Sequence, residues 1–191
     1  MSESSPKPQE STPGGKVFFV SLGCPKNRVD SELMLGDLVQ HDYEVVDDAD
    51  AADVLVVNTC SFVEEARAES VDTILDLAHI KREHQDQKKL VVTGCLPQRY
   101  ASELKAELPE VDLFLGTGDI DQIGERIGAL TGPSLPIRST RKIGKPGYNY
   151  DAYSPRVQTT PSWTSYVKIS EGCSQVCAFC IIPRLRGGQR S

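Results

Sequence analysis

The sequence predicts an α/β protein built on a doubly wound parallel sheet of five strands. Two observations carry this prediction. Short apolar segments alternate with longer amphipathic segments between residues 16 and 130. The apolar segments also lack a two-residue alternation of apolar and polar side chains, which is typical of parallel strands covered by helices on both faces.

The individual elements follow from the same patterns. Residues 54–57 form an unbroken run of Val and Leu, which indicates a buried strand. Pro97 suits the first turn of a helix, where the N–H that proline lacks has no partner. The expected strands are residues 17–22, 44–47, 54–57, 90–92 and 111–115, and the expected helices are residues 31–40, 61–83, 97–108 and 119–130. The economical strand order is 2-1-3-4-5.

The chain divides into four parts. Residues 1–15 are polar and rich in Ser, Pro and Gly, which predicts a disordered tail. Residues 16–130 form the α/β domain, and residues 131–162 place prolines among small polar residues, as a linker does. Strand character returns at residues 166–170, so residues 163–191 are interpreted as the incomplete start of a second domain.

Composition restricts the class of protein. The 191 residues carry a formal net charge of −6, which disfavours strong direct binding to nucleic acid. Residues 161–191 nevertheless carry a local excess of basic residues, which suits an anionic substrate or cofactor. No transmembrane run and no signal peptide is recognised, so a cytoplasmic location without membrane contact is expected. Cysteines stay reduced there, so six of them indicate metal binding or catalysis rather than disulfides.

Three cysteines cluster near the C-terminal end in a CxxxCxxC pattern formed by Cys173, Cys177 and Cys180. Three thiolates can hold an iron–sulfur cubane and leave one iron open, whereas a structural zinc site needs four ligands. Two alternatives remain: a zinc site that a distant histidine completes, and a chance cluster. Spacing alone does not fix the metal.

Cys24, Cys60 and Cys95 are far apart in the sequence, but each follows a predicted strand. The three strands are neighbours in the expected order, and their carboxyl ends lie at one edge, where ligands bind in such sheets. We therefore expect the three thiols to converge on a second metal cluster. The alternative is that they are ordinary small core residues.

The C-terminal pattern resembles the radical S-adenosylmethionine superfamily, in which an aromatic residue, here Phe179, precedes the third cysteine. The chain as a whole is similar to the methylthiotransferase family of that superfamily over residues 16–191. The motifs that carry this resemblance are Ser21-Leu22-Gly23-Cys24-Pro25-Lys26-Asn27, Asp30-Ser31-Glu32, Asn58-Thr59-Cys60-Ser61-Phe62, Thr93-Gly94-Cys95-Leu96, Glu171-Gly172-Cys173, Cys180-Ile181-Ile182-Pro183 and Arg186-Gly187.

The resemblance implies two [4Fe-4S] clusters. The auxiliary cluster would be held by Cys24, Cys60 and Cys95, and the radical cluster by Cys173, Cys177 and Cys180, which with Phe179 would bind S-adenosylmethionine. It implies no catalytic side chain beyond these ligands. A flavodoxin-like protein would be the reductant.

The first motif is typical of the family branch that methylthiolates the β-carbon of an aspartyl residue in small-subunit ribosomal protein twelve. S-adenosylmethionine would supply both the radical and the methyl group. The alternatives are the branch that modifies transfer RNA adenosines and a non-catalytic iron–sulfur or zinc module. Most of the family's barrel lies beyond this sequence, so we do not expect this stretch to turn over by itself.

Overall fold

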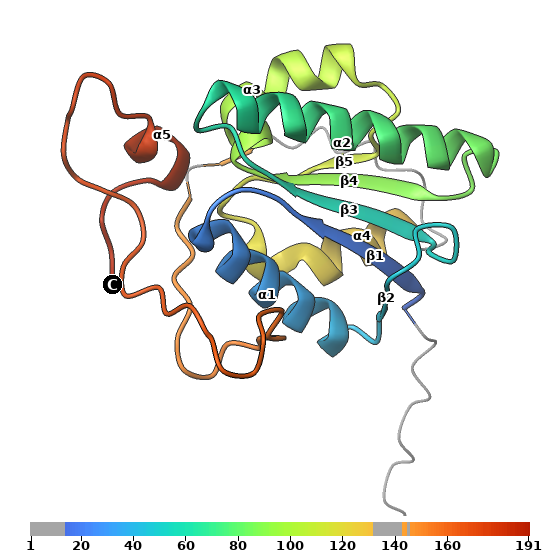
Figure 1. Cartoon of the computed structure of the whole chain (residues 1–191), viewed down its shortest axis with the longest axis horizontal. Coiled ribbons are helices and arrows are strands. Elements are labelled where there is room, and N and C mark those ends of the chain that lie inside the picture. The colour runs from blue at the N-terminus through green and yellow to red at the C-terminus, as the bar shows by residue number, and fades with distance from the viewer. Residues whose placement is uncertain (1–13, 132–142, 145) are drawn as a thin grey trace, which may run out of the picture.

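The sheet has the predicted strand order. The structure is a computed structural model that describes residues 14–131, 143–144 and 146–191. The five parallel strands are β1 (Lys16–Ser21), β2 (Glu44–Val46), β3 (Val54–Thr59), β4 (Lys89–Gly94) and β5 (Leu113–Phe114). Their order is β2-β1-β3-β4-β5, which confirms the doubly wound α/β prediction (Figure 1).

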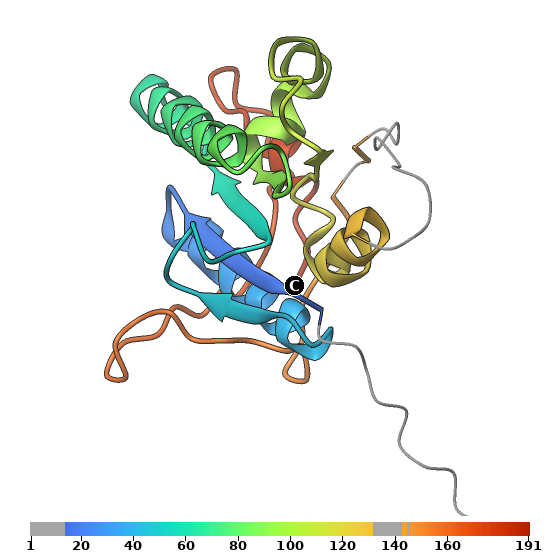
Figure 2. The same ribbon diagram turned by 90° about the vertical axis from the view of Figure 1, so that its right-hand side faces the viewer.

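Helices cover both faces of the sheet (Figures 1 and 2). The helices α1 (Pro25–Gln40) and α4 (Ile123–Thr131), with the short 3-10 turn η1 (Ile120–Gln122), lie on one face, and α2 (Glu64–Glu83) and α3 (Cys95–Glu107) lie on the other. Each face has its own apolar core: Val54 and Val56 of β3 point into the first, and Leu55 and Val57 point into the second. None of the helices in the described ranges combines the length and the apolar character needed to cross a bilayer.

The largest boundary difference concerns α1, which begins at Pro25 rather than at residue 31. Pro25 occupies the first turn, where its ring suits the helical backbone and its missing N–H costs nothing. Apolar periodicity misses this turn because its buried residues include the polar Asn27 and Asp30.

The predicted strand at residues 166–170 is wrong, because these residues form no ladder in the described part of the chain. The hydroxyl of Tyr150 takes the place of a neighbouring strand. It accepts a hydrogen bond from the backbone N–H of Lys168 at 2.8 Å and donates one to the carbonyl of the same residue at 2.5 Å. The predicted tail at residues 1–15 lies almost entirely outside the described residues, as does part of the predicted linker.

The segment from residue 146 onward crosses α1 on the side that faces away from the sheet (Figure 1). Glu32, which is fully buried, accepts hydrogen bonds from Arg156 Nε at 2.8 Å and from the backbone N–H of Thr159 at 2.8 Å. Gly36 lies so close to this segment that a Cβ there would be 2.4 Å from the carbonyl carbon of Pro155. Helix α1 is therefore enclosed between the sheet and the C-terminal segment.

The core of the second face provides a matched pair of substitutions on α2. Ile74 is fully buried, whereas its neighbour Leu75 is 45% exposed. We expect Ile74→Ala to lower the free energy of unfolding by about 2–5 kcal/mol, because it removes buried methyl groups and leaves a cavity. Leu75→Ala is expected to cost less than about 1 kcal/mol. Urea unfolding followed by circular dichroism measures both, and equal losses would contradict this packing.

Glu32 gives a prediction on pH. Burial alone would raise the pKa of Glu32, but the Thr159 N–H and the Arg156 guanidinium outweigh it and hold the pKa below its usual value of 4.5. A carboxyl group with a lowered pKa stabilises the fold above its unfolded-state pKa and loses that contribution as the pH falls. Glu32→Gln is therefore expected to lower the unfolding free energy by about 1–3 kcal/mol at pH 7.

The same variant is expected to show a smaller loss of stability than the parent chain when the pH is lowered from 5 toward 3, because it lacks the carboxyl that becomes protonated. The control is Glu69→Gln on the exposed surface of α2, which should change the unfolding free energy by less than about 0.5 kcal/mol. A Glu32→Gln variant with the parent's pH slope would refute this assignment.

Candidate functional site

The register of the sheet brings the three N-terminal cysteines to one edge. Ser21 of β1 pairs with Asn58 of β3, and Asn58 pairs with Thr93 of β4. Cys24, Cys60 and Cys95 follow these three residues at distances of three, two and two positions. The parallel strands therefore deliver all three thiols to their carboxyl ends, as the sequence predicts.

Each cysteine has a defined place at this edge. Cys24 is the N-cap of α1 and is exposed, Cys95 is the first residue of α3 and is buried, and Cys60 is buried in the loop before α2. The hydroxyl of Ser70 fixes the Cys60 loop, since it lies 3.0 Å from both the backbone nitrogen and the carbonyl oxygen of Cys60.

Gly23 brings the first loop against the second. Its φ of +90° is a conformation that side chains rarely tolerate, and a Cβ at Gly23 would lie 2.7 Å from Cβ of Cys60 and 3.1 Å from its sulfur. Only glycine allows the Cys24 loop to approach Cys60 this closely.

Asn27 connects all three loops. Its amide nitrogen donates to the carbonyl of Leu22 at 3.1 Å and to the carbonyl of Thr59 at 2.8 Å, so it joins the residues just before Gly23 and Cys60. Its side-chain oxygen lies 3.7 Å from the sulfur of Cys95 and accepts a hydrogen bond from that thiol. Asn27 is fully buried, and its role is to hold the three loops together.

The thiols nevertheless do not form a closed ligand set. Among the described residues, no three Cys, His, Asp or Glu side chains lie close enough together to hold a metal ion. Burial raises the pKa of Cys95 to about 11, against the opposing effect of Arg186, and nearby Cys60 raises it further. The shared ligand role of Cys24, Cys60 and Cys95 stays a prediction.

The donor set fits a thiolate-bound cluster in its chemistry. Three soft sulfur ligands lie on adjacent loops that Asn27 and Gly23 draw together. Cys24 and Cys95 lie at helix N-termini, where the helix dipole would stabilise the negative charge of a bound cluster, whereas burial favours the neutral thiol of Cys95 in the metal-free chain.

The second cysteine set lies on a loop whose base is closed. Glu171 and Arg190 form an antiparallel bridge through hydrogen bonds of 2.8 and 2.9 Å, and the N–H of Cys173 donates to the carbonyl of Gly187 at 3.1 Å. Within the loop, the N–H of Cys180 donates to the carbonyl of Cys177 at 3.1 Å. The loop closed by Glu171 and Arg190 therefore carries all three of Cys173, Cys177 and Cys180.

This loop faces outward. Cys177 is exposed, Cys173 and Cys180 are half-buried, and Phe179 is 93% exposed. Phe179 immediately precedes Cys180 in the sequence, but its side chain is exposed to solvent in the structure. Its predicted role in cofactor binding is untested by this arrangement.

A buried cluster of four charged side chains joins the two cysteine sets. Lys168 Nζ lies 2.5 Å from a carboxylate oxygen of Asp30 and 2.6 Å from one of Glu171. Arg186, on α5 (Ile182–Arg186), forms ion pairs with Asp30 and with Glu171, the latter at 3.2 Å. All four side chains are at most 6% exposed, and their charges cancel.

The electrostatics of this cluster are those of mutually compensated ions. Burial opposes ionisation of Glu171, but Arg186 and Lys168 outweigh it and lower the pKa of Glu171 to about 2. Burial likewise disfavours the charged form of Arg186, yet Asp30 raises the pKa of its guanidinium above the usual value. Removing one partner would leave an uncompensated buried charge.

Sequence reasoning assigned no role to Asp30 and counted Lys168 and Arg186 only in a basic excess suited to an anionic ligand, whereas the structure pairs both with Asp30 and Glu171. Apart from the contacts to Glu171, the ion-pair partners of Asp30 lie 138 and 156 positions away along the chain, so no periodicity reveals them. The only signal was the presence of Asp30 and Arg186 within motifs of the family resemblance.

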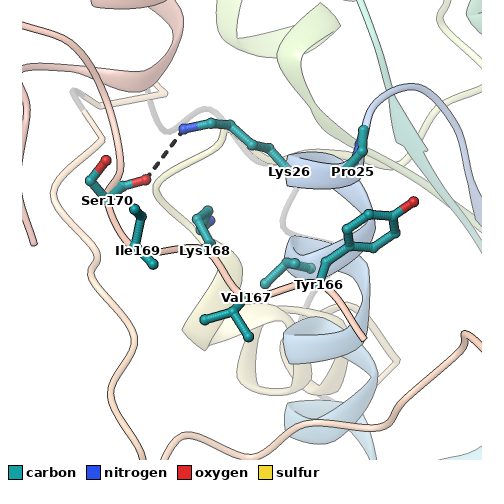
Figure 3. A pocket seen from close by; sticks show the side chains of 8 residues that line it. Pro25, Lys26, Tyr166, Val167, Lys168, Ile169 and Ser170 are labelled. Atoms are coloured by element: carbon teal, nitrogen blue, oxygen red, sulfur yellow. Dashed lines mark hydrogen bonds between the residues drawn. The ribbon is translucent and has the colours of Figure 1, made fainter. Parts of the chain in front are cut away.

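The space beside this cluster includes a shallow pocket of about 220 Å³ between the start of α1 and residues 166–170 (Figure 3). Lys26 crosses it and donates to the carbonyl of Ser170 at 3.3 Å. No cysteine lines this pocket. The pocket is a gap between α1 and residues 166–170, and it is not the predicted metal site.

Comparison with known proteins agrees with the motifs. The chain is 54% identical over 176 residues to ribosomal protein uS12 methylthiotransferase RimO of Geotalea uraniireducens (strain Rf4). It is 50% identical over 182 residues to the protein of the same name from Pelobacter propionicus (strain DSM 2379 / NBRC 103807 / OttBd1). These matches cover 92% and 95% of this chain but 38% and 40% of the relatives. The chain thus spans about two fifths of their length.

A family-wide comparison covers the α/β domain. The model of a family described as "Uncharacterized protein family UPF0004" matches residues 16–116. This range contains β1 through β5 together with Cys24, Cys60 and Cys95. The chain belongs to this family, UPF0004.

Proposed function

We propose that this chain is the N-terminal part of a radical S-adenosylmethionine methylthiotransferase that modifies ribosomal protein uS12. The observation that carries the proposal is the presence of two cysteine sets joined by one buried charge cluster, in a chain 54% identical to relatives named for that activity. One set lies on the sheet edge and the other on the C-terminal loop.

The residues divide the work between the two sets. Cys24, Cys60 and Cys95 would hold the auxiliary [4Fe-4S] cluster. Cys173, Cys177 and Cys180 would hold the second [4Fe-4S] cluster, which binds S-adenosylmethionine with Phe179 nearby. When bound, these groups supply a carbon-centred radical, a sulfur atom and a methyl group.

The other residues of the chain would position the two sets of cysteines. Asn27 holds the three N-terminal loops in place, and Gly23 gives Cys60 room. The closed base at Glu171 and Arg190 keeps the second cysteine set on one compact loop. The buried charge cluster connects the two cysteine sets. This connection supports a reaction in which hydrogen removal and sulfur transfer take place close together.

The substrate and partners follow from the relatives' name and from the motif resemblance. The proposed reaction replaces a C–H bond at the β-carbon of an aspartyl residue of uS12 with C–S–CH3. A ribosomal substrate implies action in the cytoplasm, and a flavodoxin-like protein would deliver electrons.

The metal content tests the two cysteine sets separately. The full-length protein, reconstituted anaerobically, is expected to bind about eight iron atoms, because each set holds one cubane. Replacing Cys24, Cys60 and Cys95 together by Ala is expected to leave about four, and so is replacing Cys173, Cys177 and Cys180. Iron and acid-labile sulfide are counted in each protein. Bound zinc with little iron would indicate a non-catalytic module and sink the proposal.

The substrate is tested with the full-length enzyme, S-adenosylmethionine and a reductant. We expect uS12 to gain the mass of one methylthio group in place of one hydrogen, measured on its aspartate-containing peptide. Both triple-cysteine variants should abolish this product, because each removes one of the two required groups. Methylthiolated adenosine in transfer RNA, with unmodified uS12, would assign the chain to the RNA-modifying branch instead.

A further inference from the structure

The guanidinium of Arg186 contacts Cys95 of the N-terminal set and Glu171, which lies two residues before Cys173 of the C-terminal set. One of its terminal nitrogens, Nη1, is paired with Asp30 and with Glu171. The other, Nη2, lies 2.6 Å from the side-chain oxygen of Asn27 and 3.7 Å from the sulfur of Cys95. Arg186 is 2% exposed, so these contacts are made away from water.

The chain around Arg186 connects it directly to the CxxxCxxC loop. Helix α5 follows Cys180 after one residue, and Glu171 precedes Cys173 by two. Arg186 and Glu171 thus flank the loop on both sides. Leu185, which is 1% exposed, adds an apolar anchor, and its carbonyl accepts a 2.5 Å hydrogen bond from Thr117.

We propose that Arg186 is a positioning residue that couples the C-terminal cysteine loop to the N-terminal cysteine site and donates an N–H to the sulfur of Cys95. This inference deepens the proposed function, on which its cluster-dependent part rests. It also assigns Asp30 and Glu171 the task of holding the guanidinium in that orientation.

An arginine is required by the number and direction of these contacts. A guanidinium carries five N–H groups in a planar fork. Its Nη1 can therefore donate to two carboxylates while its Nη2 donates to Asn27 and Cys95. A lysine ammonium at the same place keeps the positive charge but cannot span both sides. Arg186→Lys therefore separates the geometry of the contact from its charge.

The first experiment measures how well Cys95 is protected in the metal-free full chain. Reduced protein is labelled with iodoacetamide at one pH, and modification of the Cys95 peptide is followed by mass spectrometry. We expect Arg186→Gln to speed labelling of Cys95 by at least about tenfold, because the docked helix opens more often. Arg186→Lys should lie between this variant and the parent.

The matched control is Arg184, which lies on the same helix and is exposed. Arg184→Gln and Arg184→Lys make the same chemical changes and are expected to leave Cys95 labelling within about twofold of the parent. Should Arg186→Gln fail to fold, Arg186→Lys carries the test alone, because it retains the compensating charge for Asp30.

The second experiment asks whether the N–H reaches the sulfur when a cluster is present. In full-length protein with Cys173, Cys177 and Cys180 replaced by Ala, the N-terminal set holds the one remaining cluster, whose potential is titrated by electron paramagnetic resonance. A hydrogen bond to a ligand sulfur stabilises the reduced cluster. We expect a more negative potential in Arg186→Lys and an unchanged one in Arg184→Lys.

The outcomes separate this inference from the proposed function. Equal labelling of Cys95 in the Arg186 and Arg184 variants would overturn the positioning role, whatever metal is bound. An unchanged potential in Arg186→Lys would overturn the hydrogen bond to sulfur. Failure of the parent to take up iron would count against the proposed function, while the labelling of the metal-free chain would still decide the role of Arg186.

Discussion

The buried carboxylate of Asp30 is the contact on which the arrangement of this chain depends. It receives Lys168 and Arg186, which come from the far end of the sequence, onto the first helix of the α/β domain. A buried carboxylate without these partners would be costly, and so would the two cations without it. The C-terminal segment is therefore held by mutual charge compensation, and Asp30 and Glu32 are the residues of α1 that bind it.

This dependence explains the character of α1. A surface helix usually buries one apolar stripe, but α1 is buried almost continuously from Asn27 to Leu38. The sheet covers its apolar side, and the C-terminal segment covers its polar side. Polar residues that face the sheet, such as Ser31, are tolerated because they have hydrogen-bond partners, in this case Ser21 of β1 at 2.7 Å and Asn58 of β3 at 2.9 Å.

The sequence predicted what local periodicity encodes and missed what long-range side chains decide. Strand order and the common edge of Cys24, Cys60 and Cys95 follow from alternating segments and parallel register, and the structure has both. The strand expected at residues 166–170 was wrong because residue types alone do not supply a neighbouring strand, and here the hydroxyl of Tyr150 hydrogen-bonds the backbone of Lys168 instead. The ion pairs of Arg186 left no local pattern, since Asp30 is 156 positions away.

The position of Asn27 has a consequence for how the two ends of the molecule influence each other. The side chain of Asn27 contacts Leu22, Thr59, Cys95 and Arg186. Its hydrogen bonds therefore contribute both to the stability of the sheet edge and to the binding of α5. Thermodynamic linkage makes such a contribution reciprocal: whatever tightens the loops around the thiols also tightens the attachment of α5, and the reverse holds equally. The contacts of Asn27 thus couple the sheet edge to the C-terminal segment that the sequence pattern predicted to be a separate domain.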